Sequence, residues 1–186
     1  MKPGSAISPI AIAALLFSCM PAARADTLDP LLPLVDAAAQ RLQTADPVAA
    51  SKFLTGGQVD DPKREQQVID SVTADASRQH IDTNYVHDVF RNQIDATDSL
   101  EHSRFAQWKI DPGVAPAMAP DLSASRTEID RLNPTMVNEI AKQWATLHSP
   151  SCRVALDQAV GAVVTARRLD ALYQPALAYA THSYCR

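Results

Sequence analysis

The sequence predicts an all-α fold, a single-domain helical bundle of about six to seven helices with a disulfide near the C-terminus. Hydrophobic residues make up 46% of the 186 residues and aromatic residues only 5%, so the core should consist mainly of aliphatic side chains. The chain is rich in Ala, the strongest helix former, and contains only 5 Gly. No stretch of useful length alternates between apolar and polar residues, as a β-strand would. The length suits one domain.

Residues 1–25 are typical of a secretory signal peptide, which leaves residues 26–186 as the mature domain. Lys2 supplies a minimal basic region, residues 10–17 (IAIAALLF) are apolar, and residues 23–25 (Ala-Arg-Ala) match the small-residue cleavage pattern. The mature chain would then be periplasmic or secreted, with Asp26 as its first residue.

Two alternatives for this segment stay open. It could be an uncleaved anchor, although the apolar run is too short to span a bilayer. It could also belong to a lipoprotein modified at Cys19, although the bulky Phe17 fits that pattern poorly.

The charge of the mature chain restricts its partners. The formal net charge is −4, and removal of residues 1–25 takes away Lys2 and Arg24 but no acid, which makes it −6. An acidic domain is poorly suited to nucleic acids and to anionic membranes. We therefore expect no nucleic-acid partner and no membrane partner after signal cleavage.

Two cysteines, Cys152 and Cys185, remain in the mature chain. An even pair in an exported protein predicts a disulfide. It would close a loop of about 33 residues and stabilise the fold by roughly 3–4 kcal/mol in the chain-entropy description. Two free buried thiols are the alternative.

The first mature helix is predicted to start after Pro33 and to run to about residue 54, because apolar residues recur there at helical spacing. Pro47 lies inside this pattern. The helix either kinks at Pro47 or restarts there with Asp46 as its N-cap. Residues 55–58 (TGGQ) end it.

The later helices follow from cap and proline signals. Asp61 followed by proline predicts a helix to about residue 79, and Asp82 caps the next one, to about residue 110. The proline-rich residues 111–121 form a loop, after which Asp121 or Ser123 caps a further helix. After this loop, one helix is expected to end near residue 132, and a second to run from Asn133-Pro134 to about residue 148. Two more should cover residues 151–168 and 169–183, the last with a kink at Pro175.

Four basic residues of the mature chain have suggestive positions. Arg41 and Lys52 are eleven residues apart, and eleven steps of about 100° make three turns plus about 20°. They share one face if the helix continues past Pro47. Arg64 and Arg126 each lie in the first turn or two of a later helix.

Thr97 and Glu101 are four residues apart on a third helix, so they also share a face. Taken singly, each of these residues is ordinary, because a lone arginine on a helix usually faces solvent. Composition and spacing alone therefore predict a bundle and no particular chemistry.

Taken together, the charged positions resemble a known family, the secreted (periplasmic) AroQ-type chorismate mutases of the gamma subclass. The resemblance covers residues 31–186 and rests on the order and spacing of these positions. It is carried by residues 35–53 (VDAAAQRLQTADPVAASKF), by the DxxRE pattern of residues 61–65, and by residues 77–86, 93–109, 121–126 and 169–185.

The resemblance implies an isomerase that rearranges chorismate to prephenate without a cofactor. Arg41, Arg64 and Arg126 would bind the two substrate carboxylates, a task that suits the guanidinium fork. Lys52 would contact a carboxylate and the breaking ether oxygen, where negative charge grows in the transition state. Glu101 would face the same oxygen. The catalytic set would be Lys52, Glu101 and Arg126.

Three further residues would bind substrate. Asp61 and Glu65 would hold the hydroxyl side of the ring or orient the neighbouring cations, and Thr97 would donate to a carboxylate. Some secreted members have a Gln where this chain has Val68, and either Glu65 or Gln67 could replace that contact.

Two expectations follow from the implied site. An ionised Glu101 would repel the ether oxygen, so we expect burial to raise its pKa and activity to fall as pH rises. Because Arg126 belongs to the same chain, each subunit should hold a complete site. The family implies a homodimer, which light scattering on the purified protein would test.

The sequence also bears on three other classes of function. An exported, non-catalytic helical module that binds a small carboxylate would use the same cations and would bind without turnover. A metal site built from the five histidines lacks the spacing of known zinc motifs, so none is expected. The chain has no G-x-S-x-G elbow and no glycine-rich phosphate loop.

Overall fold

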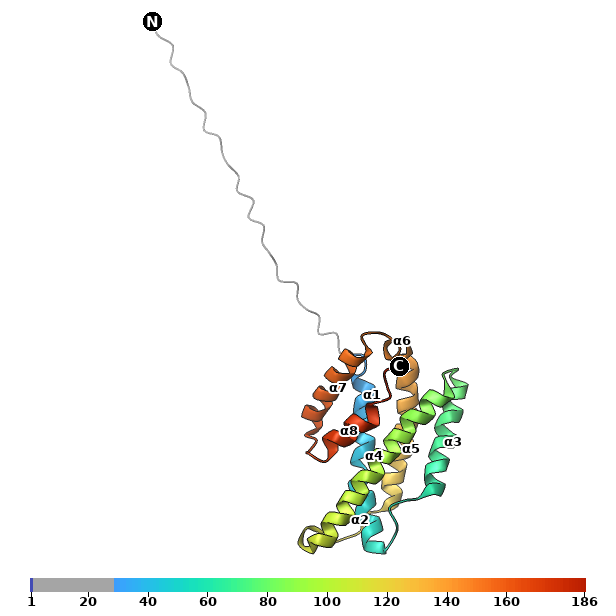
Figure 1. Ribbon diagram of the computed structural model, residues 1–186, viewed down its shortest axis with the longest axis vertical. Coiled ribbons are helices and arrows are strands. Elements are labelled where there is room, and N and C mark those ends of the chain that lie inside the picture. Colours follow the sequence, from blue (N-terminus) through green and yellow to red (C-terminus); the bar gives the residue numbers. More distant parts are fainter. Residues whose placement is uncertain (2–28) are drawn as a thin grey trace.

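The computed structural model describes Met1 and residues 29–186 (Figure 1). These residues form eight α-helices and one 3-10 turn, with no strand among them. Seven helices have nine or more residues, and α6 is a single turn, which confirms the predicted all-α class. The elements are α1 (Leu32–Gln43), α2 (Ala45–Thr55), α3 (Pro62–Arg78), α4 (Thr83–Ile110), η1 (Pro112–Val114), α5 (Leu122–Lys142), α6 (Trp144–Leu147), α7 (Cys152–Arg167) and α8 (Tyr173–Thr181).

The expected signal peptide, its cleavage site and Cys19 lie outside the described residues. Within residues 29–186, no helix combines the length and the apolar character that a membrane span requires.

The bundle is organised around α4 and α1. The 28-residue α4 packs against α2, α3 and α8, and α1 packs against α5, α7 and α8. In Figure 1, α3 and α5 run in the same direction and both begin at the lower end of the molecule. The core between these helices is largely aliphatic, as composition predicts, and includes the fully buried Leu34, Leu42, Leu100, Met136 and Ile140.

Three aspartates start helices as predicted. The side chain of Asp61 accepts a hydrogen bond from the backbone N–H of Arg64, and Asp82 caps α4 in the same way. At α5 the cap is Asp121, which resolves the choice between it and Ser123. These bonds satisfy N–H groups that have no partner within the helix.

The prolines account for the predictions that were wrong. α1 ends at Gln43, one turn before Pro47, because the proline ring would collide with the Gln43 carbonyl in a continuous helix. α2 restarts at Ala45, so Asp46 lies inside its first turn and is not the N-cap. Pro175 likewise lies in the first turn of α8, where no intrahelical N–H is needed, and α8 spans 173–181 rather than 169–183.

Pro134 does not start a helix, contrary to prediction. α5 continues through it from Leu122 to Lys142. Leu132, Met136 and Val137 are buried on both sides of the proline, so tertiary packing keeps the helix continuous despite one missing hydrogen bond. Asn133 is buried and makes a side-chain contact in the core instead of capping.

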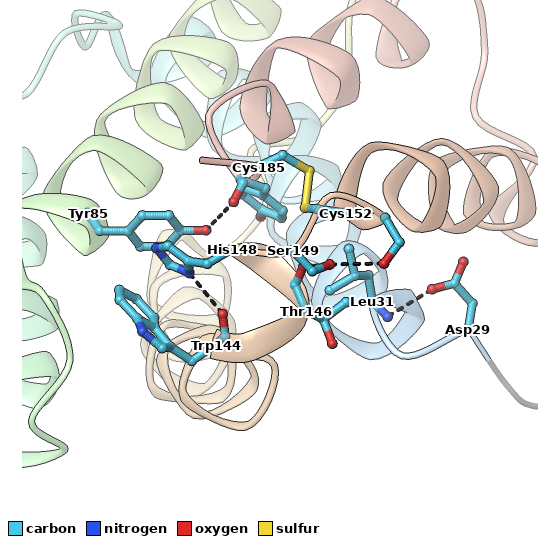
Figure 2. Close-up of a disulfide and its surroundings, with 11 residues drawn as sticks. Asp29, Leu31, Tyr85, Trp144, Thr146, His148, Ser149, Cys152 and Cys185 are labelled. Carbon is cyan, nitrogen blue, oxygen red and sulfur yellow. Dashed lines mark hydrogen bonds between the residues drawn. A yellow bond between two sulfur atoms is a disulfide. The ribbon is translucent and has the colours of Figure 1, made fainter.

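The disulfide is formed as predicted. Cys152, at the start of α7, is bonded to Cys185, with 5.6 Å between their Cα atoms and 33 residues between them in sequence. Figure 2 shows the bond beside Tyr85, whose hydroxyl donates to the carbonyl of Tyr184 at 2.6 Å. The N–H of Arg186 donates to the Leu147 carbonyl at 3.2 Å. The C-terminal residues are therefore fastened to α4, α6 and α7.

We expect the variant with both Cys152→Ser and Cys185→Ser to lose about 3–4 kcal/mol of unfolding free energy, because its unfolded chain is no longer restricted by the loop. Urea denaturation of the oxidised wild type and the variant measures this. Reduced wild type should match the variant, and reductant should not affect the variant. Identical unfolding of oxidised and reduced wild type would contradict the expectation.

Candidate active site

One cavity brings together all eight residues that the sequence analysis singled out. It lies among α1 to α5, and each of these helices contributes side chains to its wall. The eight are Arg41, Lys52, Asp61, Arg64, Glu65, Thr97, Glu101 and Arg126, and the remaining lining residues are Val48, Val59, Val68, Ile94, Asp98, Leu122 and Ile129. Arg41 and Lys52 face the same space although the helix breaks between them, because Thr44 keeps helical backbone angles (φ −73°, ψ −12°).

Arg41 is the most deeply buried cation of the cavity. Its residue is only 4% exposed, its Nε donates to Asn133 Oδ1 at 2.9 Å, and its guanidinium carbon lies 6.0 Å from the centre of the Phe90 ring. Burial lowers its pKa to about 10, so it remains charged at neutral pH. Within residues 29–186, no carboxylate lies at ion-pair distance from Arg41. A buried, unpaired charge is costly, and an anionic ligand would compensate it.

Lys52 and Glu101 form a pair inside the cavity. Lys52 Nζ donates to Glu101 Oε2 at 2.9 Å and to the Val59 carbonyl at 2.6 Å, which fixes the ammonium in one position. The Glu101 side chain is only 4% exposed. Burial raises the pKa of Glu101 to about 7, although Lys52 opposes the rise. This agrees with the expectation from the sequence.

Asp98 is a cavity residue that the sequence analysis missed. Burial and the nearby Glu65 raise its pKa to about 6, while Lys52 acts in the opposite direction. Asp98 in turn contributes to the raised pKa of Glu101. Its spacing could have revealed it, because residues three apart on a helix share a face and Asp98 precedes Glu101 by three.

Two other contributors had no usable sequence signal. The Val59 carbonyl belongs to a loop between α2 and α3, and Asn133 acts from a position that the local sequence marked as a helix start. Both roles depend on how distant segments pack.

Ion pairs between α3 and α5 border the mouth of the cavity. Arg64 pairs with Asp130, and Arg126 Nη2 lies 3.8 Å from Asp61 Oδ2. The side chain of Arg126 is 48% exposed, in contrast to the buried Arg41. The cations therefore run from the floor of the cavity to its opening.

Glu65 and Thr97, the remaining predicted residues, are each held by a hydrogen bond, Glu65 to a neighbouring helix and Thr97 to its own helix. Glu65 Oε2 accepts from Arg91 Nη2 at 2.9 Å. The Thr97 hydroxyl donates to the Gln93 carbonyl of its own helix at 2.8 Å. Val68 lines the cavity, whereas Gln67 lines only the adjoining surface hollow. Of the two proposed substitutes for the missing Gln contact, Glu65 is the one that reaches the cavity.

The lining side chains comprise four basic and four acidic residues around an apolar wall. Fixed guanidinium and ammonium groups suit a small molecule with two carboxylates. Among residues 29–186, no group of three or more His, Cys, Asp or Glu is placed to hold a metal ion. Fold and cavity together define a helical-bundle protein with an internal site for a small organic anion.

Comparison with known proteins specifies the family. A family model described as chorismate mutase type II matches residues 23–102. The secreted chorismate mutase of Mycolicibacterium smegmatis is 67% identical over 180 residues, covering 97% of this chain and 99% of the relative. The secreted chorismate mutase of Mycobacterium tuberculosis is 49% identical over 166 residues, covering 89% and 83%. The chain therefore belongs to the chorismate mutase family.

A solved structure agrees with this assignment. The crystal structure of chorismate mutase from Burkholderia phymatum superposes with a TM-score of 0.79 at 31% identity, covering 85% of this chain and 97% of that one. The resemblance to the secreted AroQ-type chorismate mutases is thereby confirmed at the level of the family, and the gamma subclass stays a prediction.

Proposed function

We propose that this protein catalyses the rearrangement of chorismate to prephenate in the cavity among α1 to α5. The observation that carries the proposal is that the eight residues with implied roles, which come from all five helices and the loop before α3, line one space. The reaction is unimolecular, so the protein has to hold one reactive conformer and stabilise the charge that develops.

In this proposal the cations of the floor and of the mouth bind the two substrate carboxylates. Arg41 binds one of them, because its buried charge lacks a protein carboxylate within the described residues. Arg126 and Arg64 bind the other, releasing Asp61 and Asp130 as they do so. Two anchored carboxylates would fix the flexible side chain over the ring and remove an entropic part of the barrier.

Lys52 and Glu101 act on the breaking bond. The Lys52 ammonium is already oriented by the Val59 carbonyl and Glu101, so little reorganisation would be needed when negative charge grows on the ether oxygen. A protonated Glu101 would donate a second hydrogen bond to that oxygen. Asp98 supports this state, because its charge disfavours ionisation of Glu101. Glu65, Asp61 and Thr97 complete the contacts to the ring hydroxyl and a carboxylate.

We expect Lys52→Ala and Arg126→Ala to lower kcat/KM for chorismate by roughly 10²–10³, because each removes a charge that meets the transition state. Loss of chorismate absorbance, followed without added metal on oxidised protein, measures the rate. Lys109→Ala, an exposed change at the end of α4, is the control. Folded wild type that binds chorismate without converting it would favour a non-catalytic carboxylate-binding module instead.

The pH dependence of the rate tests the role of Glu101. Its raised pKa means that the protonated, hydrogen-bond-donating form is present below about 7 and is lost as pH rises through that value. The rate should then fall by about tenfold per pH unit well above the pKa. Glu101→Gln donates at every pH and should abolish this alkaline loss, whereas Glu128→Gln on the surface of α5 should retain it. The same alkaline fall in Glu101→Gln and wild type would exclude this role.

We further propose that residues 1–25 are a signal peptide and that residues 26–186 form the mature chorismate mutase domain in the periplasm or the medium. Two relatives carry the description "secreted", and the cysteine pair forms a disulfide, as suits an oxidising compartment. N-terminal sequencing of the exported protein should give Asp26 as the first residue. A different first residue, or a lipid on Cys19, would contradict this.

A further inference from the structure

We propose that the hollow at the mouth of the cavity, lined by Asp61, Lys63, Arg64, Gln67 and Arg126, captures the dicarboxylate substrate before it enters, and that Lys63 supplies the capturing charge. The inference rests on the proposed function and adds a residue that has no place in the cavity itself.

The hollow and the cavity adjoin each other, because they share lining residues. Asp61, Arg64 and Arg126 line both of them, while Lys63 lines only the hollow. A carboxylate that binds in the hollow can therefore pass from Lys63 to Arg64 and Arg126 without leaving contact with the protein. These two arginines are the ones proposed to hold a carboxylate in the bound complex.

The protein as a whole does not attract such an anion. Its formal net charge is −4, and the cavity offers as many acidic as basic side chains. A dianion approaching from solvent would meet a repulsive average field and a formally neutral pocket. The hollow is locally different, with three basic residues and one acidic residue.

Among the three basic residues of the hollow, Lys63 is the one without an acidic partner in residues 29–186. Arg64 is paired with Asp130, and Arg126 lies 3.8 Å from Asp61. In residues 29–186, no carboxylate lies at ion-pair distance from Lys63, and its side chain is exposed. The two arginines are thus compensated until a ligand displaces their partners, whereas Lys63 is available to an arriving anion.

Structural stability does not explain this placement. Lys63 and Arg64 are the second and third residues of α3, where the positive end of the helix dipole disfavours cations. The first turn of α3 would be more stable with acidic residues at these positions. Because α5 also begins at this end of the molecule (Figure 1), its helix dipole adds to the positive potential at the mouth.

The test is steady-state kinetics with chorismate over a range of ionic strength, on full-length mature protein. We compare wild type, Lys63→Gln, Lys63→Glu and Lys142→Gln. The last variant makes the same charge change at the far, C-terminal end of α5. Charges act over about 30 Å at 0.01 M salt and about 3 Å at 1 M, so capture should matter only at low salt.

We expect kcat/KM of wild type to fall as salt increases. At about 0.01 M salt, Lys63→Gln should lower kcat/KM by roughly 3- to 10-fold and Lys63→Glu by more, with the difference vanishing near 1 M salt. The effect should lie in KM, with kcat changed less than twofold. Lys142→Gln should match wild type throughout.

Three results would overturn the inference. These are a salt-independent kcat/KM in wild type, equal behaviour of Lys63→Gln and Lys142→Gln, or a loss of kcat in Lys63→Gln, which would place Lys63 in the reaction step. In each case wild type would still convert chorismate, so the proposed function would stand. Wild type without turnover would remove the proposed function itself.

Discussion

The burial of the Arg41 charge is the constraint on which the site depends. Arg41 is 4% exposed, and its guanidinium lies over Phe90 and donates to Asn133. Burial lowers its pKa only to about 10, so the group stays charged at neutral pH in a poorly hydrated part of the bundle. A fold selected for packing alone would place an aliphatic side chain there, because an uncompensated buried charge destabilises the folded state. The other residues of the cavity suit the binding of an anion that neutralises this charge.

The acidic residues of the cavity have a complementary part. Four carboxyl groups share the space with four cations, which limits the repulsion among the cations in the unliganded protein. Two of them, Asp98 and Glu101, have pKa values raised to about 6 and about 7, chiefly by burial. In the proposed reaction no proton has to be transferred, and these groups act through hydrogen bonds and fields.

Helix ends were the most predictable local features, because they depend on short-range chemistry. Asp61, Asp82 and Asp121 cap helices by hydrogen bonds to backbone groups two or three residues ahead. The prolines were harder, because their effect depends on position within the finished helix. The first helix ends one turn before Pro47, and Pro175 lies in the first turn of α8, where no intrahelical N–H is needed. Helix α5 continues through Pro134, because the buried residues around it keep the helix packed.

The sequence by itself predicted the helical class from its composition and the disulfide from an even cysteine pair. The family and the eight residues that converge followed from the resemblance to chorismate mutases, because composition and charge spacing alone indicate only a bundle. The tertiary structure alone decided the depth of each charge, because burial depends on segments far apart in sequence. It placed Asn133 against Arg41 and the Val59 carbonyl against Lys52, and it added Asp98 to the cavity. It also left Lys63 outside the cavity with an exposed side chain, because solvent exposure and pairing are properties of the assembled bundle.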